Sequence, residues 1–373
     1  MRKTSFRQPL ITLLLIAACA IPARAGAEKH LKNKVYPKPA ASQLSQPGPS
    51  YAERTDVRQA ASDMALQHQL DASWVRQTLA QARYIPAIAK AIAPPPVGTP
   101  KNWRVYRSRF VEPIRIRAGV AFWQAHADTL ARAERQTGVP AAIIVGIIGI
   151  ETVYGQQMGH FRVLDALATL AFDFPASHPR AAQRSAYFKQ ELGHYLSLMQ
   201  RTGEDPQHLL GSYAGAMGMP QFMPSSWAKY ATDFDADGRI DLFASANDAI
   251  GSVANYFTAF GWKKDLPTHY PVSFDAQKLD LPALLEPDIL PTFSVASFQD
   301  KGAVLDAGAQ RHAGKLALVE LQNGADAPSY VAGTDNFYVI TRYNWSSYYA
   351  MAVIELGQAV MQARLLGAGQ IGP

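Results

Sequence analysis

The fold is decided by residues 141–155, which read AAIIVGIIGIETVYG. An unbroken run of apolar or small residues precedes Glu151, and Pro140 stands where the fixed φ of proline suits the first turn of a helix. A helix that is apolar on every face is buried in a core. The stretch therefore predicts a buried central helix over 141–150 that ends at a carboxylic acid.

Glu151 is the first candidate for chemistry. Burying a charged carboxylate is costly, so apolar surroundings would raise the pKa of Glu151 and keep it protonated near neutral pH. A carboxylic acid in that state can donate a proton to a leaving oxygen, which is general acid catalysis. The structural alternative is a glutamate that only marks the exposed end of a buried helix, and the stretch alone slightly favours this alternative.

Helical patterns continue on both sides of this stretch. Asp71 and Ser73 are candidate N-caps before apolar residues at helical spacing. Apolar periodicity predicts one long helix over 114–137. Further helices are predicted over 181–201, 248–260 and 346–366.

The segment 266–332 has a different pattern, typical of a small β-rich subdomain. Three short β-prone runs lie between Pro, Gly and Asp residues: 270–274, 292–295 and 317–321. We expect an α+β fold with a mainly helical region over 56–265, then this subdomain. Residues 333–373 are expected to return to the core as a strand and a helix.

The N-terminus has the pattern of an export signal. A basic start precedes an apolar run, residues 10–20, that is too short to span a bilayer. A lipobox over residues 16–19 gives a signal peptide of residues 1–18. The alternative is ordinary cleavage at an A-x-A site ending at Ala25, which gives a signal peptide of residues 1–25.

Cys19 is the only cysteine of the 373 residues and the candidate lipidation site. It stands where a lipobox needs it, and it is followed by Ala20 rather than Asp, which suits delivery to an outer membrane. We expect a periplasmic lipoprotein anchored to the outer membrane, with a soluble periplasmic protein as the alternative. Residues 19–55 are predicted to form a flexible linker, because they are rich in Pro, Ser, Lys and Gln and lack periodicity.

Composition limits the class of protein. With 48% hydrophobic and 18% charged residues, wholesale disorder is excluded. The formal net charge of +6, part of which lies in the export signal, suits an anionic polymer. Dense runs of Lys and Arg with interleaved aromatic residues are missing from the sequence, so no nucleic-acid partner is expected.

Two segments carry residue types that suit sugar recognition. Residues 212–226 read SYAGAMGMPQFMPSS, in which glycines allow close backbone approach and Ser and Gln offer paired donors and acceptors. Residues 343–349 read YNWSSYY, in which aromatic faces can stack on sugar rings and Asn can bond an N-acetyl group. The alternatives are a turn that only packs helices and an aromatic cluster that only fills a core.

Residues 233–241 read DFDADGRID, which is the front half of an EF-hand loop. A backbone carbonyl at position 7 and carboxylates at positions 1, 3 and 5 make an oxygen cage for Ca²⁺: Arg239 with Asp233, Asp235 and Asp237. Position 12 is Ala244 rather than Glu, but Asp248 could close the cage in an elongated loop over 233–248. The alternative is a solvated turn rich in aspartate.

Taken together, these segments resemble the membrane-bound lytic murein transglycosylase B family. The matching blocks occur in the family's order: 143–152, 212–226, 233–241, 248–257 and 338–344. The resemblance covers roughly residues 56–366 and implies a lysozyme-like core with an added helical region and a small β region. It further implies a structural Ca²⁺, and we expect no organic cofactor, glycan strands of peptidoglycan as the partner, and a monomer.

The resemblance also implies a role for individual residues. Glu151 falls on the family's catalytic glutamate. Its polar sugar-binding positions correspond to Ser212, Gln221 and Asn344. Its aromatic or basic cleft positions correspond to Tyr106, Arg184, Tyr187, Tyr256, Tyr343 and Tyr349. The chain departs from the family at Gln183, where a second arginine is expected, and at residues 219–220, where Met-Pro replaces a frequent Tyr-Gly.

The implied reaction breaks the β-1,4 bond between N-acetylmuramic acid and N-acetylglucosamine. Ordinary glycosidases use two carboxylates. Here Glu151 alone would protonate the leaving oxygen and then accept the proton of the C6 hydroxyl, which closes a 1,6-anhydromuramoyl end. A hydrolytic muramidase and a non-catalytic peptidoglycan-binding protein are the alternatives, and the presence of Glu at position 151 speaks against the second.

Overall fold

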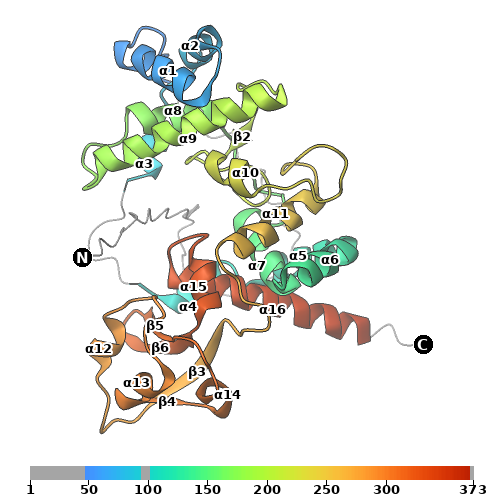
Figure 1. The fold of residues 1–373 in the computed structure, drawn as a ribbon, viewed down its shortest axis with the longest axis vertical. Coiled ribbons are helices and arrows are strands. Elements are labelled where there is room, and N and C mark those ends of the chain that lie inside the picture. The colour runs from blue at the N-terminus through green and yellow to red at the C-terminus, as the bar shows by residue number, and fades with distance from the viewer. Residues whose placement is uncertain (1–46, 94–100, 370–373) are drawn as a thin grey trace, which may run out of the picture.

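The computed structural model describes residues 47–93 and 101–369. Figure 1 shows helices in a top group and a central group, a small sheet at the bottom, and the last helix running beneath the central group. The mainly helical α+β fold expected from the sequence is confirmed. Within those two ranges, every helix is too short or too polar to cross a membrane.

The top group packs N-terminal helices onto a helical hairpin from the middle of the chain (Figure 1). Asp71 caps α2 as predicted, by accepting a hydrogen bond from the Trp74 amide at 2.6 Å, whereas Ser73 donates to the Asp71 carboxylate. The elements of this group are α1 (Thr55–His68), α2 (Ala72–Ala80), α3 (Pro86–Ala91), β1 (Phe161–Arg162), α8 (Val163–Phe172), α9 (Ala181–Thr202) and β2 (Leu210–Gly211).

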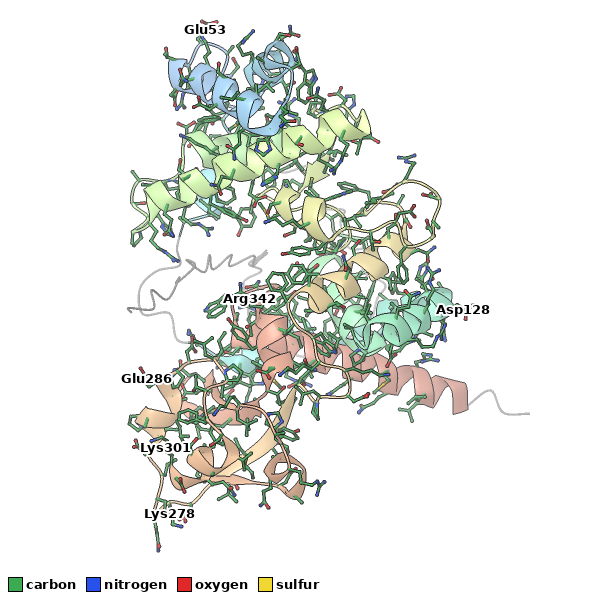
Figure 2. All side chains as sticks on the ribbon, viewed as in Figure 1. Glu53, Asp128, Lys278, Glu286, Lys301 and Arg342 are labelled. Carbon is green, nitrogen blue, oxygen red and sulfur yellow. The ribbon has the colours of Figure 1, made fainter. Side chains whose placement is uncertain are left out.

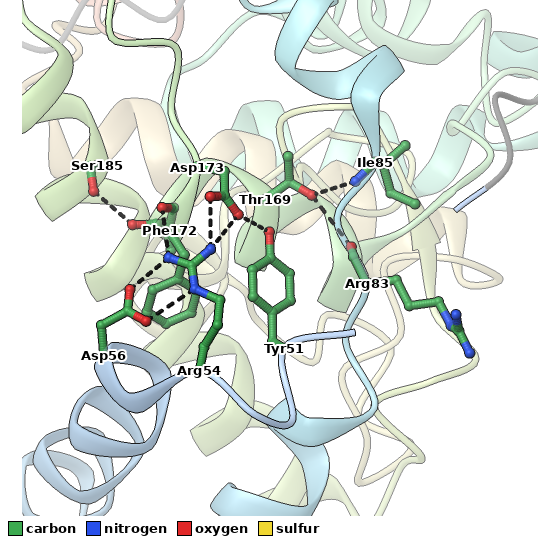
Figure 3. A network of polar contacts seen from close by, with 10 residues as sticks. Tyr51, Arg54, Asp56, Arg83, Ile85, Thr169, Phe172, Asp173 and Ser185 are labelled. Atoms are coloured by element: carbon green, nitrogen blue, oxygen red, sulfur yellow. Dashed lines mark hydrogen bonds and ion pairs between the residues drawn. The ribbon is translucent and has the colours of Figure 1, made fainter. Parts of the chain in front are cut away.

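The segment before α1 is folded against this group, so the predicted linker ends earlier than residue 55. The Arg54 guanidinium donates to both oxygens of Asp173 at 2.7 and 2.8 Å, and the Tyr51 hydroxyl donates to the same carboxylate at 2.6 Å (Figure 3). The composition of this segment could not reveal the contact, because Asp173 is 122 residues away from Tyr51. The signal peptide and Cys19 lie outside the described residues.

The central group surrounds α7 (Ala141–Thr152), which is the buried apolar helix predicted from residues 141–150. It packs against α16 (Ser347–Gly369) so closely that a Cβ at Gly146 would lie 2.3 Å from the Val353 carbonyl oxygen. A Cβ at Gly357 would lie 2.0 Å from the Ala142 carbonyl oxygen, so glycine is required on both helices. The other elements are α4 (Trp103–Ser108), α5 (Pro113–Ala125), α6 (Ala127–Thr137), α10 (Pro224–Tyr230), α11 (Ala246–Ala259) and α15 (Asp335–Thr341).

The single helix predicted over 114–137 is wrong, because α5 and α6 are separated at His126. This residue has φ −123° and ψ 27°, outside the helical region. The break lets α5 pack against α16 and α6 pack against α11, and it buries Phe122 of α5 and Leu130 of α6. The periodicity of the two halves is helical throughout, so a break at one residue leaves no mark in the pattern.

The bottom group is an antiparallel sheet in the order β4-β3-β6-β5 with its own small core. The predicted run 292–295 is not a strand, since Phe293 makes only an isolated bridge to Leu316 and Val295 begins α13. The elements are β3 (His269–Phe274), α12 (Leu281–Leu285), α13 (Val295–Asp300), β4 (Ala303–Leu305), α14 (Ala307–Gln310), β5 (Ala317–Asn323) and β6 (Asp326–Gly333).

The strand expected after residue 333 is also wrong, because Asp335–Thr341 forms α15. Thr334 caps this helix by accepting a hydrogen bond from the Asn336 amide. The Asn336 side chain donates to the carbonyls of Lys263 and Leu266, which ties the helix start to the chain that leaves α11. These contacts override the β propensity of the run that follows.

Candidate active site

Glu151 lies in the last turn of α7, where the buried helix reaches the surface of the core. Its neighbours Ile150 and Thr152 are buried, while Glu151 itself is partly exposed. Val153 and Tyr154 have φ of +50° and +58°, a left-handed conformation that ends the helix directly after Glu151. The apolar run therefore carries a carboxyl group to the edge of the core, as its sequence predicts.

The surroundings of Glu151 favour its neutral form. Burial raises the pKa of Glu151 to about 7, against a hydrogen bond from Tyr349 that lowers it. The hydroxyl of Tyr349 donates to Oε1 of Glu151 at 2.5 Å, and Tyr349 is itself buried. A carboxyl group with a pKa near the working pH can both give and take a proton.

A pocket of about 140 Å³ opens at Glu151. Side chains from α9, α10, α11 and the segment between α15 and α16 meet there with the end of α7. Six of its lining residues were predicted from the sequence: Glu151, Tyr187, Gln221, Tyr256, Tyr343 and Asn344. Glu151 is the one acidic residue among the described residues that line it.

Two tyrosine hydroxyls hold the walls of this pocket together. The Tyr343 hydroxyl donates to the Pro220 carbonyl at 2.5 Å, and the Tyr256 hydroxyl donates to the Arg342 carbonyl at 2.7 Å. Thr152 donates to the Met219 carbonyl at 2.8 Å. The Met-Pro departure from the family pattern thus lies where backbone carbonyls make the contacts, which any residue pair supplies.

Two amide side chains of the pocket offer oxygen atoms to a ligand. Gln221 has φ +51°, and its NH₂ group donates to the carbonyls of Gly218 and Met158 at 2.9 and 3.2 Å. Its side-chain oxygen is therefore the atom that faces a ligand. Oδ1 of Asn344 is buried and has no hydrogen-bond partner within the described part of the chain. An unsatisfied buried acceptor requires a donor from a ligand or water.

Four predicted residues do not line the pocket. Ser212 accepts hydrogen bonds from the amides of Ala214 and Ala216 and so shapes the turn, and Arg184 lies over the rings of Phe174 and Phe188. Tyr106 stacks against Trp103 and meets Tyr348 edge to face, and Tyr349 donates its hydroxyl hydrogen bond to Glu151. Burial and the nearby charge of Glu151 raise the pKa of both tyrosines, which places these two close to the carboxyl group.

Four residues of the pocket wall are not among the site residues predicted from the sequence. Three of them lie within the segment 212–226 that is predicted to recognise sugar: Phe222, Met223 and Ser226. Their place in that segment is the signal that could have identified them. Arg342 precedes the predicted Tyr-Asn pair and supplies the only cation among the described lining residues. Behind the wall, buried Glu191 accepts hydrogen bonds from the amide and hydroxyl of Ser225 at 2.9 and 2.6 Å and anchors the start of α10.

The loop over 233–248 brings carboxylates together. Oxygen atoms of Asp233, Asp235 and Asp248 all lie within 4.8 Å of one another. Burial raises the pKa of Asp248, and the charges of Asp235 and Asp233 raise it further. A divalent cation would offset this repulsion, and its preferred ligands are such oxygens, so these residues fit Ca²⁺.

The predicted set also includes Asp237 and the backbone carbonyl of Arg239. The Asp237 carboxylate accepts a hydrogen bond from the Arg239 amide at 2.8 Å and is not part of the three-carboxylate cluster. The Arg239 side chain lies 3.7 Å from Glu204. Asp248, predicted to close the elongated loop, lies with Asp233 and Asp235.

Comparison with known proteins gives one consistent result. Residues 52–358 match the family model described as the transglycosylase SLT domain. The chain is 39% identical over 330 residues to the membrane-bound lytic murein transglycosylase B of Escherichia coli, which covers 86% of this chain and 87% of that protein.

Solved structures agree with this match. The Escherichia coli lytic transglycosylase SLT35 in complex with calcium has a TM-score of 0.74 at 38% identity, covering 88% of this chain and 99% of that one. SltB3 from Pseudomonas aeruginosa, in complex with NAG-NAM-pentapeptide, has a TM-score of 0.68 at 30% identity, covering 84% of this chain and 80% of that one. The chain belongs to the SLT-domain family of lytic transglycosylases, among the relatives of membrane-bound lytic murein transglycosylase B.

Proposed function

We propose that the protein is a lytic transglycosylase that cleaves the β-1,4 bond between N-acetylmuramic acid and N-acetylglucosamine in peptidoglycan and leaves a 1,6-anhydromuramoyl end. The observation that carries the proposal is the position of Glu151, which is the one acidic residue of its pocket and has a pKa raised to about 7. The membership of the chain in the family supports the same reaction.

We infer the position of the acidic proton within Glu151 from the contact with Tyr349. Because the Tyr349 hydroxyl donates to Oε1, the acidic proton belongs on Oε2, the oxygen left to meet the substrate. Glu151 protonates the leaving glycosidic oxygen, and the N-acetyl group of the substrate stabilises the positive charge at C1. The carboxylate then removes the proton of the C6 hydroxyl, which attacks C1. The proton given in the first step is recovered in the second, so one residue serves both.

Polar groups around Glu151 suit an N-acetyl sugar. The orphan Oδ1 of Asn344 can accept the N–H of an acetamido group, and the Gln221 oxygen can accept a sugar hydroxyl. Tyr187 and Tyr256 supply aromatic faces. Two predicted residues support the site without lining the pocket. Ser212 shapes the turn, and Arg184 packs against the aromatic residues behind the wall.

We infer a structural Ca²⁺ in the loop over 233–248, held by Asp233, Asp235 and Asp248. Asp237 and the backbone carbonyl of Arg239 complete the predicted set. Support comes from the crowded carboxylates and from the calcium complex of SLT35. The ion would fix the loop against α11 and take no part in proton transfer.

The predicted location is the periplasm, with a lipid on Cys19 as an anchor to the outer membrane. The support is the lipobox pattern and the membrane-bound relative. Replacing Cys19 with Ala while keeping the A-x-A site would release an anchored protein into the soluble fraction. Equal fractionation of the two proteins would contradict lipidation.

Digestion of purified peptidoglycan tests the activity. The parent protein is expected to give products with anhydro ends, one water lighter than reducing ends. Glu151→Gln is expected to give no product, since an amide cannot donate and retrieve the proton. Glu53→Gln is the matched control, because that side chain is 94% exposed. Reducing ends would indicate a muramidase, and an inactive parent that binds the polymer would indicate a non-catalytic binding protein.

A further inference from the structure

Arg342 is a cation in the pocket of Glu151 whose function the reaction does not explain. It follows α15 and lines the pocket together with Tyr343 and Asn344. Figure 2 shows Arg342 on the side of α15 that faces the upper half of the molecule. The proton transfers assigned to Glu151 need no positive charge at this position.

Aromatic rings hold the guanidinium in place. Its central carbon lies 5.4 Å from the ring centroid of Phe260 and 5.8 Å from those of Tyr338 and Trp345. Such contacts orient a planar guanidinium and compensate part of its lost hydration. Toward other described side chains, the Arg342 guanidinium makes one hydrogen bond, a long one to the Tyr338 hydroxyl at 3.5 Å. The aromatic rings fix the plane of the Arg342 guanidinium and leave the N–H groups at its edge available to a ligand.

Among the residues that the structure describes, no carboxylate pairs with the positive charge of Arg342. None of the ion pairs within residues 47–93 and 101–369 includes it. Burial and the hydrogen bond from Tyr349 are the causes of the shifted pKa of Glu151, so the positive charge of Arg342 is not paired with that carboxyl group either. A cation that is oriented, partly buried and unpaired in a small pocket is suited to an anionic group of a ligand.

The substrate class limits what that anion can be. The sugar rings and N-acetyl groups of a glycan strand are neutral. Carboxylates occur on the lactyl group of a muramoyl residue whose peptide has been removed, or on the peptide when it is present. Because Arg342 and Glu151 line the same pocket, the carboxylate must belong to a muramoyl residue next to the bond that breaks.

We propose that Arg342 determines substrate specificity by binding a carboxylate carried by the muramoyl residue at the cleavage site. This inference rests on the proposed function. The planar fork of the guanidinium can bond both oxygens of the carboxylate, which aligns the sugar as well as attracting it. Arg342 touches substrate in this role, but it does not exchange protons with it.

The test compares three soluble glycan fragments of equal length. One carries peptides with free carboxylates, the second carries the same peptides with all carboxylates amidated, and the third has the peptides removed and the lactyl carboxylates free. Arg342→Gln should lower kcat/KM roughly tenfold, mainly through KM, on a fragment whose carboxylate it binds. The amidated fragment should lose less than about twofold. Arg342→Lys should restore part of the loss, because it keeps the charge without the planar fork.

Arg364→Gln is the matched control. Arg364 also lies over an aromatic ring, 5.2 Å from the Trp123 centroid, but belongs to α16 away from the pocket. A loss confined to the peptide-bearing fragment assigns the peptide carboxylate, and a loss confined to the peptide-free fragment assigns the lactyl carboxylate. An equal loss on all three fragments, or no loss, overturns the proposal. A parent protein that gives no anhydro product on any fragment would instead refute the proposed function.

Discussion

Glu151→Gln should change the pH dependence of stability as well as abolish activity. The pKa of Glu151 is raised from 4.5 to about 7. At about 1.4 kcal/mol per pKa unit, ionising this group in the folded protein costs about 3 kcal/mol. The folded state thus binds the proton more tightly than the unfolded chain. The contribution of Glu151 to stability is fully present below about pH 4.5 and is lost as the pH rises through 7.

Glutamine has nearly the same size and cannot ionise, so it does not suffer this loss. The free energy of unfolding of Glu151→Gln, relative to the parent, should rise by about 3 kcal/mol from about pH 4.5 to about pH 8. Urea unfolding of both proteins at several pH values measures the difference, in which the other titrating groups cancel. Glu53→Gln is the control for loss of a carboxylate, because the Glu53 side chain is 94% exposed. A constant difference for Glu151→Gln would refute the claim that burial keeps this carboxyl group protonated.

Three further changes test the contacts around the site and the fold. Tyr349→Phe removes the hydrogen bond that lowers the pKa of Glu151, so the descending limb of the pH–rate profile should move to higher pH and kcat should fall roughly tenfold; an unmoved limb would speak against the contact. Asp248→Asn should reduce the rise in Tm that Ca²⁺ gives over chelator, and a rise equal to that of the parent would exclude Asp248 as a ligand. Arg54→Met should lower the free energy of unfolding in urea by about 1 kcal/mol more than Arg58→Met in the first turn of α1, and equal effects would show that the Asp173 contact adds nothing.

The helix that carries the site could be predicted because its signal is local. The apolar run of 141–150 can only be buried, and Glu151 is the first charged residue after it. Asp71 is likewise recognisable from its place before a helical pattern, and it caps α2. Patterns of this kind depend on neighbours in the chain.

Features that depend on distant residues could not be predicted. Tyr51 falls in the predicted linker because its partner Asp173 is 122 residues away, directly after α8. A strand is predicted after residue 333 because the partners of Asn336 lie near α11, far along the chain. At the metal loop, three of the predicted carboxylates come together, those of Asp233, Asp235 and Asp248, whereas Asp237 is not part of this cluster. Side-chain direction after folding decides these cases, and spacing alone does not report it.

The residues of the site also fall into those that the sequence predicts and those that only the folded chain reveals. Tyr343 and Asn344 were identified through the family pattern, while adjacent Arg342 was not, because an isolated arginine on the sequence gives no sign that it lacks a counter-charge. The ion pairs of the described residues do not include Arg342, and this observation, which the sequence cannot supply, supports a role for its charge in binding a ligand. Its aromatic neighbours also come from separate segments, Phe260 after α11 and Trp345 before α16.

The most direct test of the single-carboxylate reaction is digestion of peptidoglycan in water enriched in the heavy oxygen isotope. If the C6 hydroxyl attacks C1 after Glu151 has protonated the leaving oxygen, the newly formed muramoyl ends will be anhydro ends and will contain no heavy oxygen. Heavy oxygen at C1 of the new ends would show that water is the nucleophile and would contradict the account.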